Sequence, residues 1–177
     1  QIGTITGAVP EKTAAGYRFP VAMWSGQDFG PKEYGPKNDP LSPPKLCAGV
    51  FTKAKGGRIT SSAEMSLVFD LPEPEAGKEA VLNLEGQDAV SRGAAPHHLK
   101  NKEITMMRIT LNGTVIYDGE CGFAIHNWSR REFKIPAGVL KKENNSLVIR
   151  NTGHARGAFV YCWILISDAQ LQFPGQQ

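Results

Sequence analysis

Short runs of hydrophobic residues, separated by turn residues, dominate the chain from residue 46 onward. In one of these runs Met65, Leu67 and Phe69 occupy every second position, so their side chains would share one face of a strand. Such patterns predict eight strands, at residues 46–53, 63–71, 80–88, 103–111, 115–117, 130–135, 146–151 and 158–167. Many short strands with almost no helical pattern are typical of a β-sandwich or a barrel.

Two local features sharpen this prediction. Asn112-Gly113 lies between two hydrophobic runs, where a type I′ hairpin turn needs two residues that tolerate positive φ. The run 159–166 is hydrophobic at every position, as expected for a strand whose two faces are both covered. The only helical hint is a single turn near residues 136–140. We therefore expect an all-β, antiparallel sandwich with residues 159–166 in a central strand.

The segment 17–45 has a different composition. It contains six prolines, which oppose helices and central strands, so it is predicted to be a long irregular loop. It also contains Tyr17, Phe19, Trp24, Phe29 and Tyr34, and a solvated linker does not usually carry so many rings. We expect this loop to be ordered and packed against a single sandwich domain that spans residues 1–177, with the main strands in 46–173.

Composition and charge are those of an ordinary globular chain. Hydrophobic residues make up 41% and charged residues 21% of the 177 positions, and the formal charge is only +3. The basic residues are scattered, which argues against a nucleic-acid partner. No hydrophobic run approaches the roughly 20 residues that span a bilayer, so membrane insertion is not expected. The chain starts at Gln1 without a signal-peptide pattern, which suggests a processed or excised piece whose export signal could have been removed.

Three cysteines are present, Cys47, Cys121 and Cys162, and their number and spacing do not fit a zinc site. Either Cys121 and Cys162 form a disulfide or the cysteines are buried thiols, and the sequence leaves both alternatives open. His97 and His98 have no third ligand at a metal-like spacing, so a transition-metal site is not expected.

The segments ITLNGTVIYDG, NWSRREFKIPAGVLKKENNSLVIRN and WILISDAQLQF resemble the C-terminal half of galactose-binding-like jelly-roll domains. Such domains occur beside bacterial glycoside hydrolases and polysaccharide lyases. The pattern has a physical basis, because Phe133 and Ile135 would point into the core while Leu140 would fill the turn after the strand. The resemblance implies a jelly-roll fold and a secreted or cell-surface location. It also suggests a structural calcium ion, for which Glu64 and Asp168 are the candidate ligands.

Sugar-binding modules use aromatic rings to stack on the sugar and polar side chains to bind its hydroxyl groups. Trp128 beside His126 and Arg130 supplies such a set just before a predicted strand. Trp128 could equally be a core residue that caps the sandwich, since the indole ring buries a large apolar area.

Two further groups are candidate ligand-binding residues. His154 and Arg156 lie in a glycine-bounded loop, which could bind hydroxyl or carboxylate groups or could simply be a solvated hairpin tip. Trp24 and Tyr34 could form a stacking platform, or they could anchor the proline-rich loop to the sandwich.

The leading functional hypothesis is a non-catalytic carbohydrate-binding or ancillary module of a secreted protein that acts on polysaccharide. Its partners would be a polysaccharide or oligosaccharide and a neighbouring catalytic domain, and no cofactor other than calcium is expected. A structural or protein-interaction sandwich is the first alternative. A polysaccharide lyase or glycoside hydrolase is the second alternative, although the chain has no nucleophile elbow, P-loop or Cys/His nucleophile arrangement.

Overall fold

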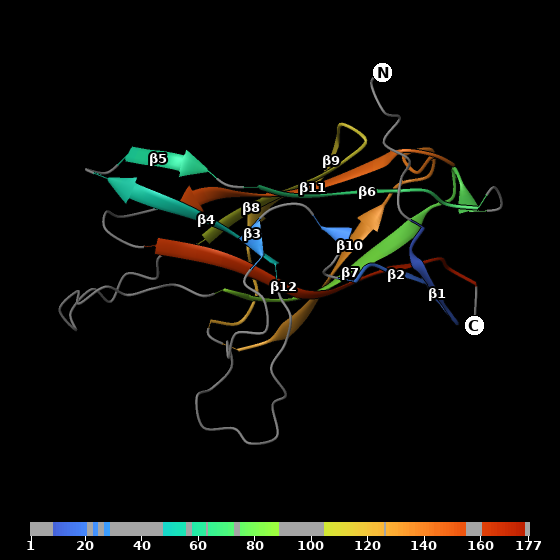
Figure 1. Ribbon diagram of the computed structural model, residues 1–177, viewed down its shortest axis with the longest axis horizontal. Helices are drawn as coiled ribbons and strands as arrows, with labels where there is room; N and C mark the ends of the chain where they lie inside the picture. The colour runs from blue at the N-terminus through green and yellow to red at the C-terminus, as the bar shows by residue number, and fades with distance from the viewer. Residues whose placement is uncertain are drawn as a thin grey trace.

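The computed structural model describes residues 9–20, 23–24, 27–28, 48–55, 58–62, 64–72, 75–88, 105–125, 127–154 and 161–175. These residues form two antiparallel sheets that face each other, and they contain no α-helix (Figure 1). The antiparallel β-sandwich predicted from the sequence is therefore confirmed. The described part of the chain has no helix that is long and apolar enough to cross a membrane.

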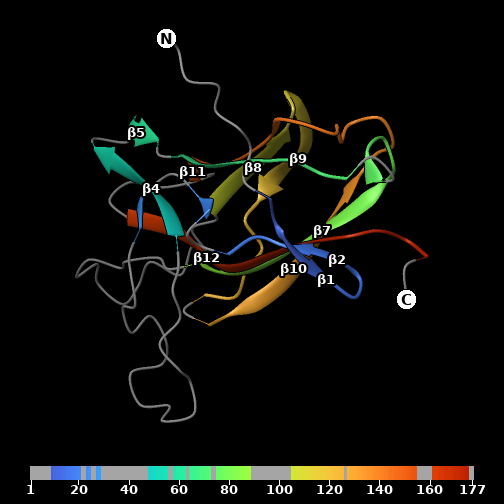
Figure 2. The ribbon, with the colours of Figure 1, turned by 45° about the vertical axis from the view of Figure 1, so that its right-hand side comes forward.

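The smaller sheet has the strand order β6-β11-β8-β9. Its strands are β6 (Glu64–Phe69), β11 (Asn145–His154), β8 (Thr105–Leu111) and β9 (Thr114–Glu120). The larger sheet contains β1 (Glu11–Thr13), β2 (Gly16–Arg18), β3 (Gln27–Asp28), β4 (Ala48–Lys55), β5 (Arg58–Ser62), β7 (Ala80–Asp88), β10 (Ser129–Ile135) and β12 (Tyr161–Gln172). Figure 2 shows the two sheets from a second direction, with β6, β8 and β11 above β7, β10 and β12.

The hydrophobic core lies between the sheets and follows the alternation in the sequence. Met65, Leu67 and Phe69 of β6 are each at most 1% exposed, so their shared face is the buried one. The opposite layer contributes Leu82 and Leu84 of β7. Burial of these side chains away from water is the main force that holds the two sheets together.

The C-terminal half agrees closely with the expected pattern. Asn112 and Gly113 have φ angles of 52° and 81°, as the predicted type I′ hairpin turn requires. β10 ends at Ile135, immediately before Pro136, and Leu140 fills the following turn with 2% exposure. The described part of this turn, where a single helical turn was hinted at, is not helical.

β12 is the central strand of the larger sheet. It pairs with β7 along one side and with β2 and β4 along the other. The consecutive residues Ile164, Leu165 and Ile166 are all buried, and consecutive side chains point to opposite faces of a strand. Both faces are therefore covered at this position, as the hydrophobic run predicted.

Four strands were not predicted, namely β1, β2, β3 and β5. β2 lies at the start of the segment expected to be irregular, and its register places Gly16 opposite Gln172 of β12. A three-residue strand has no recognisable alternation, so only pairing with β12 reveals it. Of the predicted loop, the structure describes residues 17–20, 23–24 and 27–28, and the remainder of that prediction lies outside the described residues.

Candidate functional site

Buried polar side chains gather at the end of β7. Asp88, the last residue of β7, is only 6% exposed, and Thr105, the first residue of β8, is 1% exposed. The Thr105 hydroxyl donates a hydrogen bond of 2.9 Å to Oδ1 of Asp88. Because β7 and β8 belong to different sheets, this bond links the two layers of the sandwich at one end.

The inward direction of Asp88 follows from the alternation along β7. Leu82, Leu84 and Gly86 precede it at every second position and are buried, so Asp88 continues the face that packs into the core. The sequence therefore carried a signal for this site, since an acidic residue ends the inward row of a core strand. We did not predict Asp88 or Thr105 as functional residues from that signal.

Two segments that are distant in sequence meet at this pair. The Asp88 backbone N–H donates to the carbonyl of Ala124 at 3.1 Å, and Asp88 forms a β-bridge with Ile125. On the other side, His154 of β11 is the register partner of Thr105, after a bulge that follows Asn151. The structure thus brings the segments around the predicted 126–130 and 154–156 candidates to one end of the sandwich.

Cys121 and Arg131 fix the chain that passes beside Asp88. Cys121 is a buried thiol whose backbone N–H donates to the carbonyl of Thr105 at 2.6 Å. The Arg131 guanidinium donates to the carbonyls of Glu120, at 3.0 Å, and of Cys121. The same guanidinium lies 4.8 Å from the ring centroid of Tyr117, a distance at which a cation is attracted to the ring face. This corner is therefore held by side-chain contacts as well as by strand pairing.

A second buried carboxylate lies near the opposite end of β7. Glu75 is 5% exposed and precedes the start of β7, and it lies beside the phenol of Tyr17, which is 3% exposed. Burial raises the pKa of Tyr17, and the negative charge of the nearby Glu75 raises this pKa further. The two ends of the sandwich thus each contain a buried carboxylate beside a hydroxyl group.

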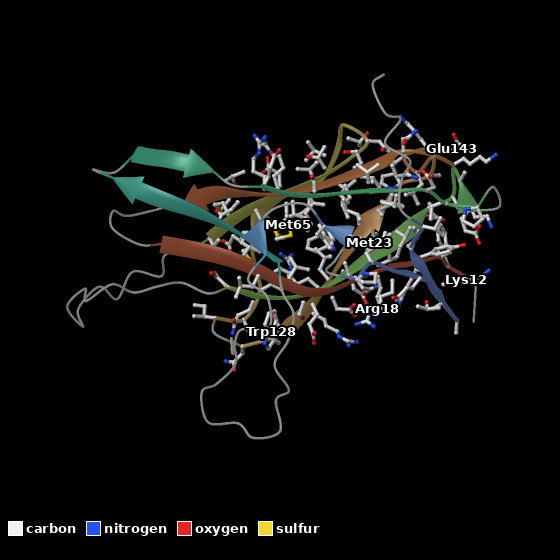
Figure 3. All side chains as sticks on the ribbon, in the orientation of Figure 1. Lys12, Arg18, Met23, Met65, Trp128 and Glu143 are labelled. Atoms are coloured by element: carbon white, nitrogen blue, oxygen red, sulfur yellow. The ribbon has the colours of Figure 1, made fainter. Side chains whose placement is uncertain are left out.

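Among the described members of the predicted sugar site, the structure separates Trp24 from Trp128 and Arg130. Trp24 is half-buried and packs against the hydrophobic core, which agrees with the anchoring alternative. Trp128 is also half-buried, and Figure 3 shows it on the outer side of the larger sheet, away from Met65 between the sheets. Arg130 is exposed on that outer side, opposite Glu85. Tyr34, His126, Arg156 and the side chain of His154 lie outside the described residues.

The two predicted calcium ligands lie on different sheets and each pairs with an arginine. Oε2 of Glu64, on β6, accepts a hydrogen bond of 2.9 Å from Nε of Arg150. Oδ1 of Asp168, on β12, accepts one of 2.7 Å from Nε of Arg18. The structure therefore does not bring these carboxylates together. Within the described ranges, no group of three or more His, Cys, Asp or Glu residues could hold a metal ion.

Comparison with known proteins gives similarity at the level of structure only. No family model matches the sequence, and no curated protein matches it. One similar solved structure is a Stig cyclase, Fisc, from Fischerella sp. TAU in complex with (3Z)-3-(1-methyl-2-pyrrolidinylidene)-3H-indole. It shares 11% identity, with 94% of this chain and 98% of that chain covered and a TM-score of 0.39. Another is a cyclase from the same organism at 11% identity, with coverages of 94% and 97% and a TM-score of 0.40.

These findings correct the functional hypothesis drawn from the sequence. The similar structures reported above are cyclases, so the prediction of a non-catalytic carbohydrate-binding module is contradicted. The geometry supplies a physical reason, because sugar stacking needs exposed rings on a common surface. Trp24 instead packs against the core, whereas Trp128 lies half-buried on the outer side of the larger sheet.

Proposed function

We propose that this chain binds a small ligand at the Asp88 end of the sandwich, with the Asp88 carboxylate as its polar anchor. The observation that carries the proposal is that this carboxylate is 6% exposed and is oriented by a hydrogen bond of 2.9 Å from Thr105. A buried carboxylate is costly, because it loses the water that stabilises its charge. Buried ionisable groups are concentrated at functional sites, where they serve binding or catalysis despite their cost in stability.

The chemistry of the anchor suggests the class of ligand. An ionised carboxylate only accepts hydrogen bonds, and here Oδ1 accepts one from the Thr105 hydroxyl. A ligand that binds to this anchor would therefore present a donor, such as a protonated amine, an amide or the N–H of a heteroaromatic ring. Charge-assisted bonds of this kind contribute about 1.5–3 kcal/mol, more than neutral ones.

The position of Asp88 in the fold also supports a binding site. Residues from β7 and β8, from the segment 121–125 and from the end of β11 all converge there. Binding sites are commonly built where segments from several strands meet at one end of a rigid scaffold. The corner held by Arg131 would keep the segment 121–125 in place while a ligand binds.

The test uses small probes of defined charge and NMR spectra of the full chain. Benzylamine and imidazole are donors, and benzoate is the anionic control. The donors should shift the backbone amide signals of Asp88, Thr105 and Ile125, and benzoate should not. Asp88→Asn should weaken donor binding by about 10-fold to 100-fold, because it removes a charged acceptor worth about 1.5–3 kcal/mol.

The matched control is Asp118→Asn, which makes the same chemical change at an exposed aspartate of the smaller sheet. This variant should bind the donors like the natural chain. If no donor shifts the three amide signals, or if Asp88→Asn binds donors unchanged, Asp88 is a structural link between the sheets and the proposal is wrong.

A further inference from the structure

Four charged side chains form a row across the outer face of the smaller sheet. In the strand register Glu64 of β6 is opposite Arg150 of β11. Arg150 is in turn opposite Arg108 of β8, and Arg108 is opposite Asp118 of β9. The order of charges across the four strands is therefore negative, positive, positive, negative, with the two arginines in the centre.

Each arginine is held by the carboxylate on its outer side. Nε and Nη2 of Arg108 donate to Oδ2 of Asp118 at 3.0 and 2.7 Å. Nε and Nη2 of Arg150 donate to Oε2 of Glu64 at 2.9 and 2.5 Å. Each guanidinium thus binds its carboxylate through the edge formed by Nε and Nη2, and this pairing fixes the orientation of each arginine on the sheet.

This geometry places the two positive charges next to each other in the middle of the row and the two negative charges at its ends. Opposite residues of antiparallel strands have Cα atoms about 4.5–5.5 Å apart, and like charges at that separation repel each other. The bonds to Asp118 and Glu64 engage the Nε and Nη2 edge of each guanidinium and direct it toward its outer carboxylate. A guanidinium has five N–H donors, so the end of each group, which includes Nη1, keeps donor capacity. The arginine side chains are 45% and 49% exposed, so a small solute can reach them.

We infer that the Arg108–Arg150 pair is a binding site for a dianionic phosphate group. A phosphate dianion has a charge of −2, which matches the two adjacent positive charges and relieves their mutual repulsion. Its tetrahedral oxygens can accept hydrogen bonds from two guanidinium groups at once, which a single arginine cannot provide. Thr110 lies two residues beyond Arg108 in β8, so its hydroxyl is on the same face of the sheet.

The site is independent of the ligand proposed for Asp88. It lies on the outer face of the smaller sheet, whereas Asp88 points between the sheets. The two ligands also have opposite requirements, because Asp88 needs a donor and the arginine pair needs an acceptor. Failure of one proposal therefore has no bearing on the other.

The test is a titration of the full chain with inorganic phosphate at about pH 8 and constant ionic strength, followed by backbone NMR. Phosphate should shift the amide signals around Arg108 and Arg150 and half-saturate at about millimolar concentration, as expected for an open, partly solvated site. Arg108→Gln and Arg150→Gln should each weaken this response at least about 10-fold, because each leaves a single guanidinium.

Arg18→Gln is the matched control. Arg18 is 50% exposed and forms an ion pair of 2.7 Å with Asp168, but it belongs to the other sheet. This variant should respond to phosphate like the natural chain. The inference is overturned if acetate at equal ionic strength gives the same shifts, if the shifts spread evenly over the surface, or if Arg108→Gln and Arg150→Gln respond unchanged. Circular dichroism would verify that each variant keeps its β-sheet.

Discussion

Replacement of Asn145 by alanine should destabilise the sandwich more than any ordinary surface change. Asn145 is the first residue of β11 and is 0% exposed. Its Nδ2 donates to the carbonyls of Phe69 and Lys141 at 3.3 and 2.7 Å. Its Oδ1 accepts from the backbone N–H of Lys141 at 2.7 Å and from Nδ2 of Asn112 at 2.9 Å. All four hydrogen-bonding positions of this amide are therefore used.

The magnitude follows from those four bonds. Each contributes about 0.5–1.5 kcal/mol net, so their sum is about 2–6 kcal/mol. Three of the four are only partly buried, and water can replace some of what is lost there. We therefore expect a loss of about 3–4 kcal/mol in the free energy of unfolding. For a chain of this size that corresponds to a decrease in Tm of about 6–16 °C.

The assay is urea unfolding followed by circular dichroism, with Asn127→Ala as the control. Asn127 is exposed, and its Nδ2 donates a long hydrogen bond of 3.3 Å to the carbonyl of Ile125. Its replacement should change stability by no more than about 0.5 kcal/mol. A loss below about 1 kcal/mol in Asn145→Ala would refute the reasoning, because it would mean that four bonds at a buried amide add almost nothing.

Two other changes test the end of the sandwich near β2. Because burial beside Glu75 raises the pKa of Tyr17 above 10.0, the folded chain keeps a proton that the unfolded chain releases, and stability should fall as pH rises above about 10. Tyr17→Phe should lack this part of the alkaline loss when unfolding is compared between about pH 9 and pH 11. Gly16→Ala should destabilise by about 3 kcal/mol or more, because an added Cβ would lie 1.9 Å from the carbonyl oxygen of Leu171. Gly138→Ala is its control, since it has positive φ but open space and should cost only about 1 kcal/mol in thermal unfolding.

The strands of the C-terminal half were predictable because their signals are local. Alternation placed Phe133 and Ile135 in the core, and Asn112-Gly113 specified its own turn through two positive φ angles. β12 continues to Gln172, beyond the predicted end at residue 167. Its last part alternates between buried apolar residues and half-buried polar ones such as Gln170, so the hydrophobic run alone underestimated its length.

The candidate site was less predictable because its geometry depends on pairs that are distant in sequence. Glu64 looked like a calcium ligand, but its carboxylate is neutralised by an arginine 86 positions away. Asp168 is similarly paired with an arginine 150 positions away. Conversely, Asp88 ends an ordinary strand, and only the pairing of sheets shows that it faces Thr105 inside the sandwich. Residue type and spacing carry no information about such partners.

The outward face of the larger sheet is buried beside Asp88 and partly exposed farther along β12. This difference explains why we expect ligand binding at Asp88 and not elsewhere on that sheet. Leu165 and Gln87 are register partners on the outward face, yet they are 1% and 3% exposed, so both faces are enclosed beside Asp88. Farther along β12 the outward residues Asp168 and Gln170 are only half-buried. A carboxylate in the enclosed part is less screened by water, so each hydrogen bond to it is electrostatically stronger. The same aspartate-to-asparagine change should therefore weaken donor binding at residue 88 and leave it unchanged at residue 168.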